Sequence, residues 1–235
     1  MDASDVDQQL SSLAGLGDPI RRALYRHVAE RGTPVSRDEA AKAAGISRPL
    51  AAYHLDKLVD DGLLEPRYQR RGGRQGPGAG RPAKHYVRAD RQLELSLPAR
   101  DYAALAELLA GAVEADPSGS AKAALDRGAA TLGAELGAEA AQGTAPDGDP
   151  DRPLAALRQA LAARGYEPYE EADGTIRLRN CPFDRVATRH RELVCGANHA
   201  MLQALTDQVD GDPPTVRAVL DPKPGRCCVT LTRAS

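Results

Sequence analysis

Residues 36–62 read Ser-Arg-Asp-Glu-Ala-Ala-Lys-Ala-Ala-Gly-Ile-Ser-Arg-Pro-Leu-Ala-Ala-Tyr-His-Leu-Asp-Lys-Leu-Val-Asp-Asp-Gly. Ser36 and Glu39 have the spacing of a capping box, so a helix is predicted to begin there. Gly45 suits the positive φ that ends such a helix, and Ser47 can cap a second helix directly afterwards. Two short helices joined by so tight a turn are typical of a helix-turn-helix.

The second of these helices is predicted to have two distinct faces. Ala51, Leu55 and Leu58 recur at helical spacing and are expected to face the core. The opposite face is expected to contact DNA through Arg48, Pro49, Ala52, Tyr53 and Lys57. A forked arginine can bind guanine, and the other polar side chains can reach phosphates or base edges. His54 lies between the faces and is interpreted as a hydrogen-bonded boundary residue rather than a base contact.

A basic hairpin is predicted to follow. From Pro66 to Arg88 the chain has seven Lys or Arg and no Asp or Glu, although its formal net charge is -2. Residues 63–68 and 84–87 are predicted strands around a tip, 72–82, that is rich in Gly and Pro. Charge of one sign in this place indicates a wing that contacts phosphates and the minor groove rather than a solvated loop. The residues expected to bind DNA from the wing are Arg67, Arg70, Arg71, Arg74, Arg81 and Lys84.

Three stretches of this N-terminal part carry a resemblance. They read Gly-Asp-Pro-Ile-Arg-Arg-Ala-Leu-Tyr at 17–25, Ser-Arg-Pro-Leu-Ala-Ala-Tyr-His-Leu-Asp-Lys-Leu at 47–58 and Gly-Leu-Leu at 62–64. Together they resemble the ArsR-type winged-helix transcriptional regulators, which implies double-stranded operator DNA as the partner. The metal-thiolate sites known in some of these repressors have no match here, because the first cysteine is Cys181.

The length of 235 residues suggests more than one domain, and the expected fold class is α+β. Residues 17–91 are predicted to form a winged helix-turn-helix domain, 96–142 a helical dimerisation segment, and 153–233 an α/β sensor domain with an antiparallel sheet. The chain has no long apolar run for a membrane span, and residues 1–7 are acidic, unlike a signal peptide. A cytoplasmic location without membrane contact is therefore expected.

The helical segment is predicted to carry an apolar stripe. Its members, three or four residues apart as in a short coiled-coil seam, are Tyr102, Leu105, Leu109, Ala112 and Val113. The stripe can pack on its own chain or on a second copy, and a homodimer is favoured because helix-turn-helix proteins read two-fold sites as dimers. The next helix, 121–141, contains Gly128 and Gly133, which permit close packing, but it is interpreted as an Ala-rich scaffold.

The last part of the chain is predicted to have the element order α-β-β-α-α-β-β, which implies an antiparallel sheet covered by helices. Its four cysteines are Cys181, Cys195, Cys227 and Cys228. Cys195 is placed in the first turn of its helix, where the helix dipole favours a thiolate. Cys227 and Cys228 are expected to lie on opposite sides of a strand, so that a site uses one of them, with Cys227 favoured, and hardly both.

The clustering of cysteines in one part of the chain suggests reduced thiols or a cofactor site rather than a disulfide framework. Three converging thiolates suit an iron–sulfur cluster or zinc. The cysteine spacing matches neither a zinc ribbon nor a ferredoxin, and isolated buried cysteines that act as small hydrophobes are the plain alternative.

Three further stretches carry a second resemblance. They read Asn-Cys-Pro-Phe at 180–183, Leu-Val-Cys-Gly-Ala-Asn at 193–198 and Pro-Gly-Arg-Cys-Cys-Val at 224–229, with His190 between the first two. They resemble the sensor domain of the winged-helix repressors of iron–sulfur-cluster assembly (Suf) operons. The resemblance implies that the cysteines hold an iron–sulfur cluster, of 4Fe–4S type, and that the cluster-loaded dimer binds its operator.

By position in that family, the ligands would be Cys181, Cys195 and one of Cys227 and Cys228. His190 and His199 are possible fourth ligands, although each is more often a surface or second-shell residue, and with a histidine tetrahedral zinc becomes the competing cofactor. The predicted function is a DNA-binding transcriptional regulator, a repressor by resemblance, that senses cluster or redox status.

Two other functions compete with this one. The first is a winged-helix regulator with a zinc or small-molecule site in the C-terminal part. The second is a thiol-dependent enzyme in which Cys195 is a nucleophile and His190 or His199 its base. The enzyme is disfavoured because the sequence has neither a Gly-rich phosphate loop nor a paired carboxylate constellation, so catalytic residues are not expected.

Overall fold

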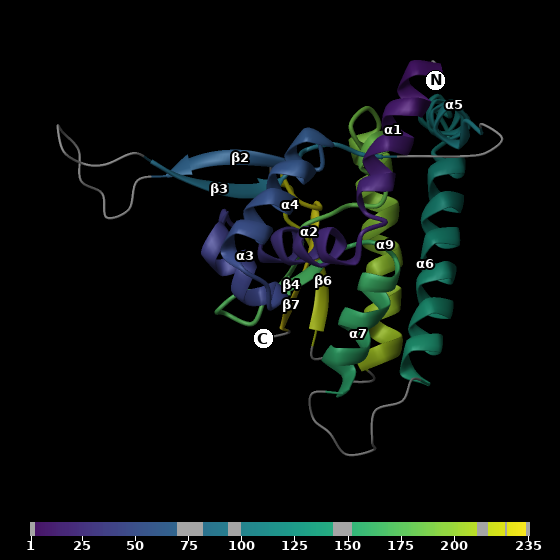
Figure 1. Cartoon of the computed structure of the whole chain (residues 1–235). Coiled ribbons are helices and arrows are strands. Elements are labelled where there is room, and N and C mark those ends of the chain that lie inside the picture. Colours follow the sequence, from purple (N-terminus) through teal and green to yellow (C-terminus); the bar gives the residue numbers. More distant parts are fainter. Residues whose placement is uncertain are drawn as a thin grey trace. The chain divides into compact units, whose positions relative to one another are not determined.

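The computed structural model describes residues 3–69, 82–93, 100–142, 152–210, 216–223 and 225–233. The chain divides into two compact units, residues 1–100 (unit 1) and residues 101–235 (unit 2). Figure 1 labels the elements of both units. Within the described ranges, no helix combines the length and the apolar character that crossing a bilayer requires.

Unit 1 consists of helices followed by a small sheet. Its described elements are α1 (Ala3–Gly15), α2 (Pro19–Arg31), β1 (Val35–Ser36), α3 (Arg37–Ala44), α4 (Arg48–Asp60), β2 (Leu64–Gln69) and β3 (Ala83–Arg88). The strands are antiparallel in the order β1-β3-β2, and β2 and β3 form a hairpin in the register Leu64 opposite Arg88. Both predicted strands of the basic hairpin are thereby confirmed.

Helices α3 and α4 begin and end as their sequence predicts. Ser36 Oγ accepts a hydrogen bond from the backbone N–H of Glu39 at 3.2 Å. Ser47 Oγ accepts one from the N–H of Leu50 at 3.4 Å. Gly45 ends α3 with a φ of 64°, a left-handed conformation in which a side chain would be strained. These local bonds fix where α4 starts.

The core of unit 1 lies where α2, α3, α4 and the sheet meet. Leu24, Leu55, Leu58 and Tyr86 are each 0% exposed within it. The predicted inward face of α4 is therefore confirmed, and the opposite face of α4 is left open.

Unit 2 contains the longer helices and a second sheet. Its described elements are α5 (Tyr102–Glu114), α6 (Ser120–Ala141), α7 (Arg152–Ala163), β4 (Pro168–Glu170), β5 (Ile176–Leu178), α8 (Asp184–Ala187), α9 (Arg191–Asp210), β6 (Val216–Leu220) and β7 (Val229–Arg233). The sheet is antiparallel in the order β4-β5-β7-β6. From α7 onward this is the predicted order α-β-β-α-α-β-β. Strand β7 begins at Val229, however, so Cys227 and Cys228 precede the strand in which they were expected to lie.

Helix α6 packs directly along α9, and Figure 1 shows the two helices side by side. Glycines make the approach possible: a Cβ on Gly133 would collide with the carbonyl oxygen of Met201, and a Cβ on Gly137 would lie 2.6 Å from that of Leu205. The small residues of α6 are thus a packing surface rather than a plain scaffold.

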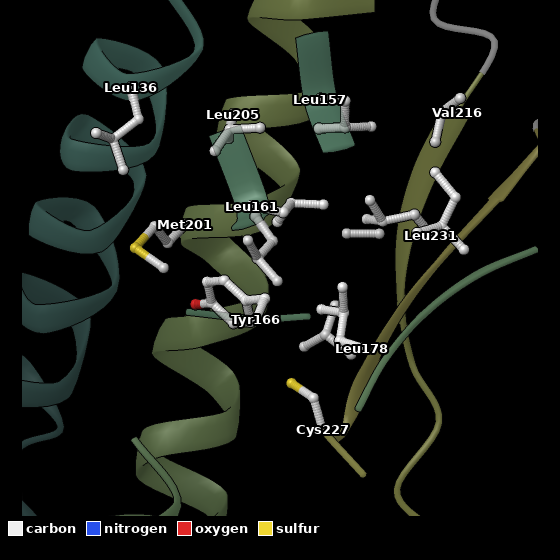
Figure 2. Packing of buried hydrophobic residues seen from close by; sticks show 14 of the residues in the cluster. Leu136, Leu157, Leu161, Tyr166, Leu178, Met201, Leu205, Val216, Cys227 and Leu231 are labelled. Carbon is white, nitrogen blue, oxygen red and sulfur yellow. The ribbon is translucent and has the colours of Figure 1, made fainter. Parts of the chain in front are cut away.

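The core of unit 2 fills the space between α7, α9 and the sheet (Figure 2). Leu161 and Leu178 are 0% exposed, and Leu157 and Leu231 are 1% exposed. Cys227 lies at one edge of this core beneath Leu178, with its sulfur directed toward a helix (Figure 2). The cysteine is therefore part of the packed interior and not a surface thiol.

Candidate nucleic-acid interface and cysteine site

The open face of α4 displays most of the residues predicted to contact DNA. Arg48, Pro49, Tyr53 and Lys57 are exposed, and Ala52 is half-buried. His54 is only 7% exposed, so it lies on the core side of the helix rather than at the boundary, and base contact from this position is ruled out. Its Nδ1 has no hydrogen-bond partner among the described residues, so the predicted hydrogen bond at that atom is not seen there.

Four described cations of this face and of the hairpin lie beside carboxylates of unit 1. The pairs are Arg48 with Asp38 (2.6 Å), Lys57 with Asp60 (3.6 Å), Arg67 with Glu65 (3.0 Å) and Lys84 with Asp56 (2.5 Å). The pairs of Arg48, Lys57 and Arg67 are exposed and contribute little free energy, so a DNA phosphate can replace their carboxylates. The Lys84 side chain is only 22% exposed. Arg70, Arg71, Arg74 and Arg81 lie outside the described residues, and their contact with DNA stays a prediction.

A cleft of about 470 Å³ separates the start of α3 and α4 from the hairpin. Its lining includes three cationic residues, Arg37, Arg48 and Lys84, together with Tyr68 of β2 and Asp38 of α3. A concave surface with this charge is suited to the sugar-phosphate backbone, because most protein–DNA hydrogen bonds go to phosphate and sugar.

One carboxylate joins α4 to the neighbouring elements. Asp56 accepts hydrogen bonds from Lys84 Nζ (2.5 Å), Tyr86 Oη (2.7 Å) and Arg37 Nη2 (3.2 Å). Burial alone would raise the pKa of Asp56, but the hydrogen bonds from Lys84 and Tyr86 lower it below its usual value. Burial and the bond to Asp56 raise the pKa of Tyr86 to about 12.

The four cysteines meet at one end of the unit 2 core. Cys181 follows β5, Cys195 lies on α9, and Cys227 and Cys228 precede β7. The thiol of Cys227 forms hydrogen bonds with those of Cys181 and Cys228, and Cys228 also bonds with Cys195. All four are free thiols; Cys227 and Cys228 are buried, whereas Cys181 and Cys195 are half-buried. Three separate segments therefore converge on one group of sulfurs.

Two expectations about these cysteines were wrong. The pair Cys227 and Cys228 precedes the strand, so the alternation of strand side chains does not apply, and both thiols join the group. Gly225, with φ 76°, and the bond from Cys227 N to Leu178 O (3.0 Å) hold the chain in this course. Cys195 is the fifth residue of α9, beyond the first turn in which the helix dipole acts.

Hydrogen bonds among the thiols shift their pKa values in opposite directions. Hydrogen bonds from Cys181 and Cys228 lower the pKa of Cys227. The bond to Cys227, together with burial, raises the pKa of Cys181 and that of Cys228. One thiolate is thus stabilised by its neighbours, and further thiolates require a bound cation, as in metal–thiolate sites.

Asn198 is a member of the site that the sequence reasoning missed. Its Nδ2 donates to Cys227 Sγ at 3.4 Å, and its Oδ1 accepts from Tyr166 Oη at 2.5 Å. Asn198 is 2% exposed, and it follows Cys195 by three residues, which places both on one side of α9. That helical spacing was the signal that could have found it.

The comparisons with known proteins bear on unit 1. A family model described as a helix-turn-helix domain matches residues 16–67. Residues 16–67 form a helix-turn-helix domain. The match includes α2, α3 and α4 and indicates a DNA-binding regulator. Comparisons with curated proteins and with solved structures gave no significant match.

Unlike the helix-turn-helix domain, the proposed metal ligands have no match in the comparisons. In the structure, the hydrogen-bond partner of each histidine is a group other than a thiol. His190 Nδ1 lies 2.7 Å from Glu114 Oε2, and His199 Nε2 lies 3.0 Å from Ala218 O. Among the described residues, no group of three or more His, Cys, Asp or Glu is arranged to hold a metal ion. A donor set of thiols nevertheless has the softness that iron–sulfur clusters and zinc select.

The apolar stripe of α5 is exposed on unit 2. Tyr102 is 68% exposed, Leu105 54% and Leu109 59%. Leu108, which was not assigned to the stripe, is 73% exposed and widens it. Large apolar side chains gathered on one helix mark an interaction surface.

Proposed function

We propose that the chain is a winged-helix repressor of the ArsR type, in which α4 enters the major groove and the β2–β3 hairpin is the wing. The observation that carries this proposal is the capped helix α4, whose outer face displays Arg48, Tyr53 and Lys57 beside a basic hairpin. Helices of this kind place three or four side chains on base edges. The matched helix-turn-helix domain supports the same reading.

The active form is a homodimer in this proposal, because one recognition helix reads too few base pairs for useful specificity. The exposed stripe of Tyr102, Leu105 and Leu109 on α5 supports it, since a coiled-coil seam needs a second helix. Two half-sites about ten base pairs apart are expected in the operator.

The sensing site in this proposal is the group of four thiols, Cys181, Cys195, Cys227 and Cys228, and the cofactor is an iron–sulfur cluster. The sequence resemblance to repressors of cluster-assembly operons and the convergence of the four cysteines support this. The cluster would supply sensitivity to oxidation and iron supply. Zinc is the competing cofactor, because four thiolates also form a structural zinc site. A role for Cys195 as an enzyme nucleophile is disfavoured, because the hydrogen-bond partners of His190 and His199 are Glu114 and the Ala218 carbonyl and not Cys195.

Selection of duplexes from a random DNA pool tests the DNA-binding proposal. We expect a two-fold sequence to emerge, and Arg48→Ala to cost about 1–3 kcal/mol and to relax preference at one base position. Arg158→Ala is the matched control, because Arg158 is an exposed arginine of α7 that pairs with Glu170 in unit 2. Failure of the wild-type protein to enrich any sequence would reject the proposal.

Anaerobic purification followed by iron, sulfide and zinc analysis tests the cofactor. Iron and sulfide in equal amounts, with a charge-transfer absorption in the visible, are expected for an iron–sulfur cluster. Detection of zinc without iron or sulfide would reject the cluster and identify zinc as the cofactor. Absence of all three in protein that still binds its selected duplex would remove the metal from the proposal.

A further inference from the structure

We propose that Asp56 and Lys84 are positioning residues that fix the hairpin against α4, and that Lys84 does not neutralise a DNA phosphate. This inference rests on the proposed DNA binding and revises the role expected of Lys84 from its charge.

The first observation is the convergence of donors on Asp56. Its carboxylate accepts from Arg37 at the start of α3 and from Lys84 and Tyr86 of β3. Lys84 and Tyr86 are two residues apart and so lie on the same side of the strand. Arg37 Nε also donates to Tyr86 Oη at 2.9 Å, which closes the network. One side chain of the recognition helix therefore anchors both α3 and the hairpin.

The second observation is that the donors to Asp56 are less exposed than Asp56 itself, whose side chain is 43% exposed. Tyr86 is 0% exposed, so its hydroxyl cannot leave Asp56 without disturbing the core. The Lys84 side chain is 22% exposed, and its ammonium lies 5.2 Å from the centre of the Tyr86 ring. A lysine that has both a carboxylate and an aromatic face loses two interactions if it turns to a phosphate.

Arg67 provides the contrast on the same hairpin. Its side chain is 60% exposed, and its carboxylate partner, Glu65, is two residues away on the same strand. An exposed pair of that kind contributes little free energy, so Arg67 is free to exchange Glu65 for a phosphate. Arg67 and Lys84 thus have different roles despite equal charge.

The consequence concerns specificity. Contacts with base edges specify the sequence, and contacts with phosphate fix the register of the protein on the duplex. The Asp56 network sets the placement of the hairpin relative to α4, and so it connects these two kinds of contact. Loosening it should lower discrimination between sequences more than it lowers general affinity.

The test measures binding of the full chain to a duplex that the wild-type protein selects and to a scrambled duplex, over a range of salt concentrations. Each cation that neutralises a phosphate contributes about 0.9 to the slope of log affinity against log salt. Arg67→Gln should therefore flatten the slope by about 0.9, whereas Lys84→Gln should leave it unchanged. Lys84→Gln should instead reduce the selected-to-scrambled ratio about fivefold or more, the scale of one mismatched base pair.

Asp56→Asn is the second variant, and it decides the matter if Lys84→Gln does not fold. It frees Lys84, so the slope for the scrambled duplex should steepen by about 0.9 while the ratio falls. A flatter slope in Lys84→Gln, or an unchanged ratio in either variant, would overturn the inference. Lack of any preference in the wild-type protein would instead reject the proposed function, so the two failures are distinguishable.

Discussion

The open face of α4 and the group of four cysteines are the two regions that carry the proposed function, and they are built in opposite ways. The α4 face comes from one continuous stretch, and its charged side chains are exposed, Arg48 at 64% and Lys57 at 47%. The cysteine group comes from three separate segments, and Cys227 and Asn198 are 1% and 2% exposed. A helix face built from one stretch keeps its structure when a single side chain is substituted. A buried group of side chains from several segments depends on each of those side chains for its packing and hydrogen bonds.

The energies of the two regions differ for the same reason. On the α4 face, ion pairs such as Arg48 with Asp38 lie in water, where each contributes about 0–1 kcal/mol. In the cysteine group the polar atoms are shielded, so a donor that loses its partner costs about 1–3 kcal/mol. Substitutions in unit 2 should accordingly have the larger effects.

The largest effect is expected from Cys227→Ser. Cys227 contacts both Cys181 and Cys228, so its loss should remove nearly all bound cofactor from anaerobically purified protein, measured as metal per chain. Cys228→Ser should also lower retention, because Cys228 bonds with Cys195. His199→Gln is the control and should keep its cofactor, since His199 bonds with the backbone of β6. Full retention in Cys227→Ser would show that the thiols do not form the site.

The next effect concerns the packing of α6 on α9 in unit 2. Gly133→Ala should destabilise unit 2 by about 1–3 kcal/mol, because the added methyl group meets the backbone of Met201. Gly128→Ala on the same helix meets no atom within 4 Å and should stabilise it by up to about 1 kcal/mol through helix propensity. Urea denaturation measures both. Equal changes in the two variants would contradict the close crossing.

The same contrast explains which features the sequence could predict. The caps at Ser36 and Ser47 and the left-handed Gly45 depend on neighbours three or four residues away, and all three are confirmed. The two strands of the hairpin were predicted from the Gly- and Pro-rich tip between them, and their pairing is confirmed. Periodicity likewise placed Leu55 and Leu58 in the core.

The sequence-based predictions that were wrong concern features whose structure is determined by contacts between residues far apart in the sequence. The start of β7 is set by its pairing with β5 and β6, so the sequence pattern wrongly placed Cys227 and Cys228 within the strand and separated them. Gly133 was expected to permit close packing, but its partner, Met201, is far along the chain and was not identified. The hydrogen-bond networks around Asp56 and Asn198 were missed because each joins segments that the sequence does not order in space.

A smaller effect is expected at the cap of α4 in unit 1. Ser47→Ala should cost about 1 kcal/mol of stability, because the N–H of Leu50 loses its acceptor. Ser47→Asp retains an acceptor and adds a negative charge at the helix N-terminus, so it should restore the loss. Chemical denaturation of each variant measures the effect. If Ser47→Ala lowered the free energy of unfolding as much as Gly133→Ala does, local contacts would not be the weaker ones, and the comparison between the two regions would be contradicted.

The smallest effect at neutral pH is expected from ionisation of the Asp56 network. The pKa of Asp56 is lowered from 3.8, so its contribution to stability is present above that pH and is lost as the pH falls through the folded-state pKa. The pKa of Tyr86 is raised from 10.0 to about 12, so its contribution is present below pH 10.0 and is lost as the pH rises toward 12. Between these limits neither group changes charge, and stability should not vary with pH through this network.

Tyr86→Phe should remove the alkaline loss of stability and keep the acid loss, because Asp56 still accepts from Lys84 and Arg37. The difference in urea midpoint between wild type and variant isolates Tyr86 from other tyrosines, including Tyr166, whose pKa burial also raises. If that difference stayed constant from neutral pH to pH 12, Tyr86 would not be the ionising group, and the alkaline limb would belong to another residue.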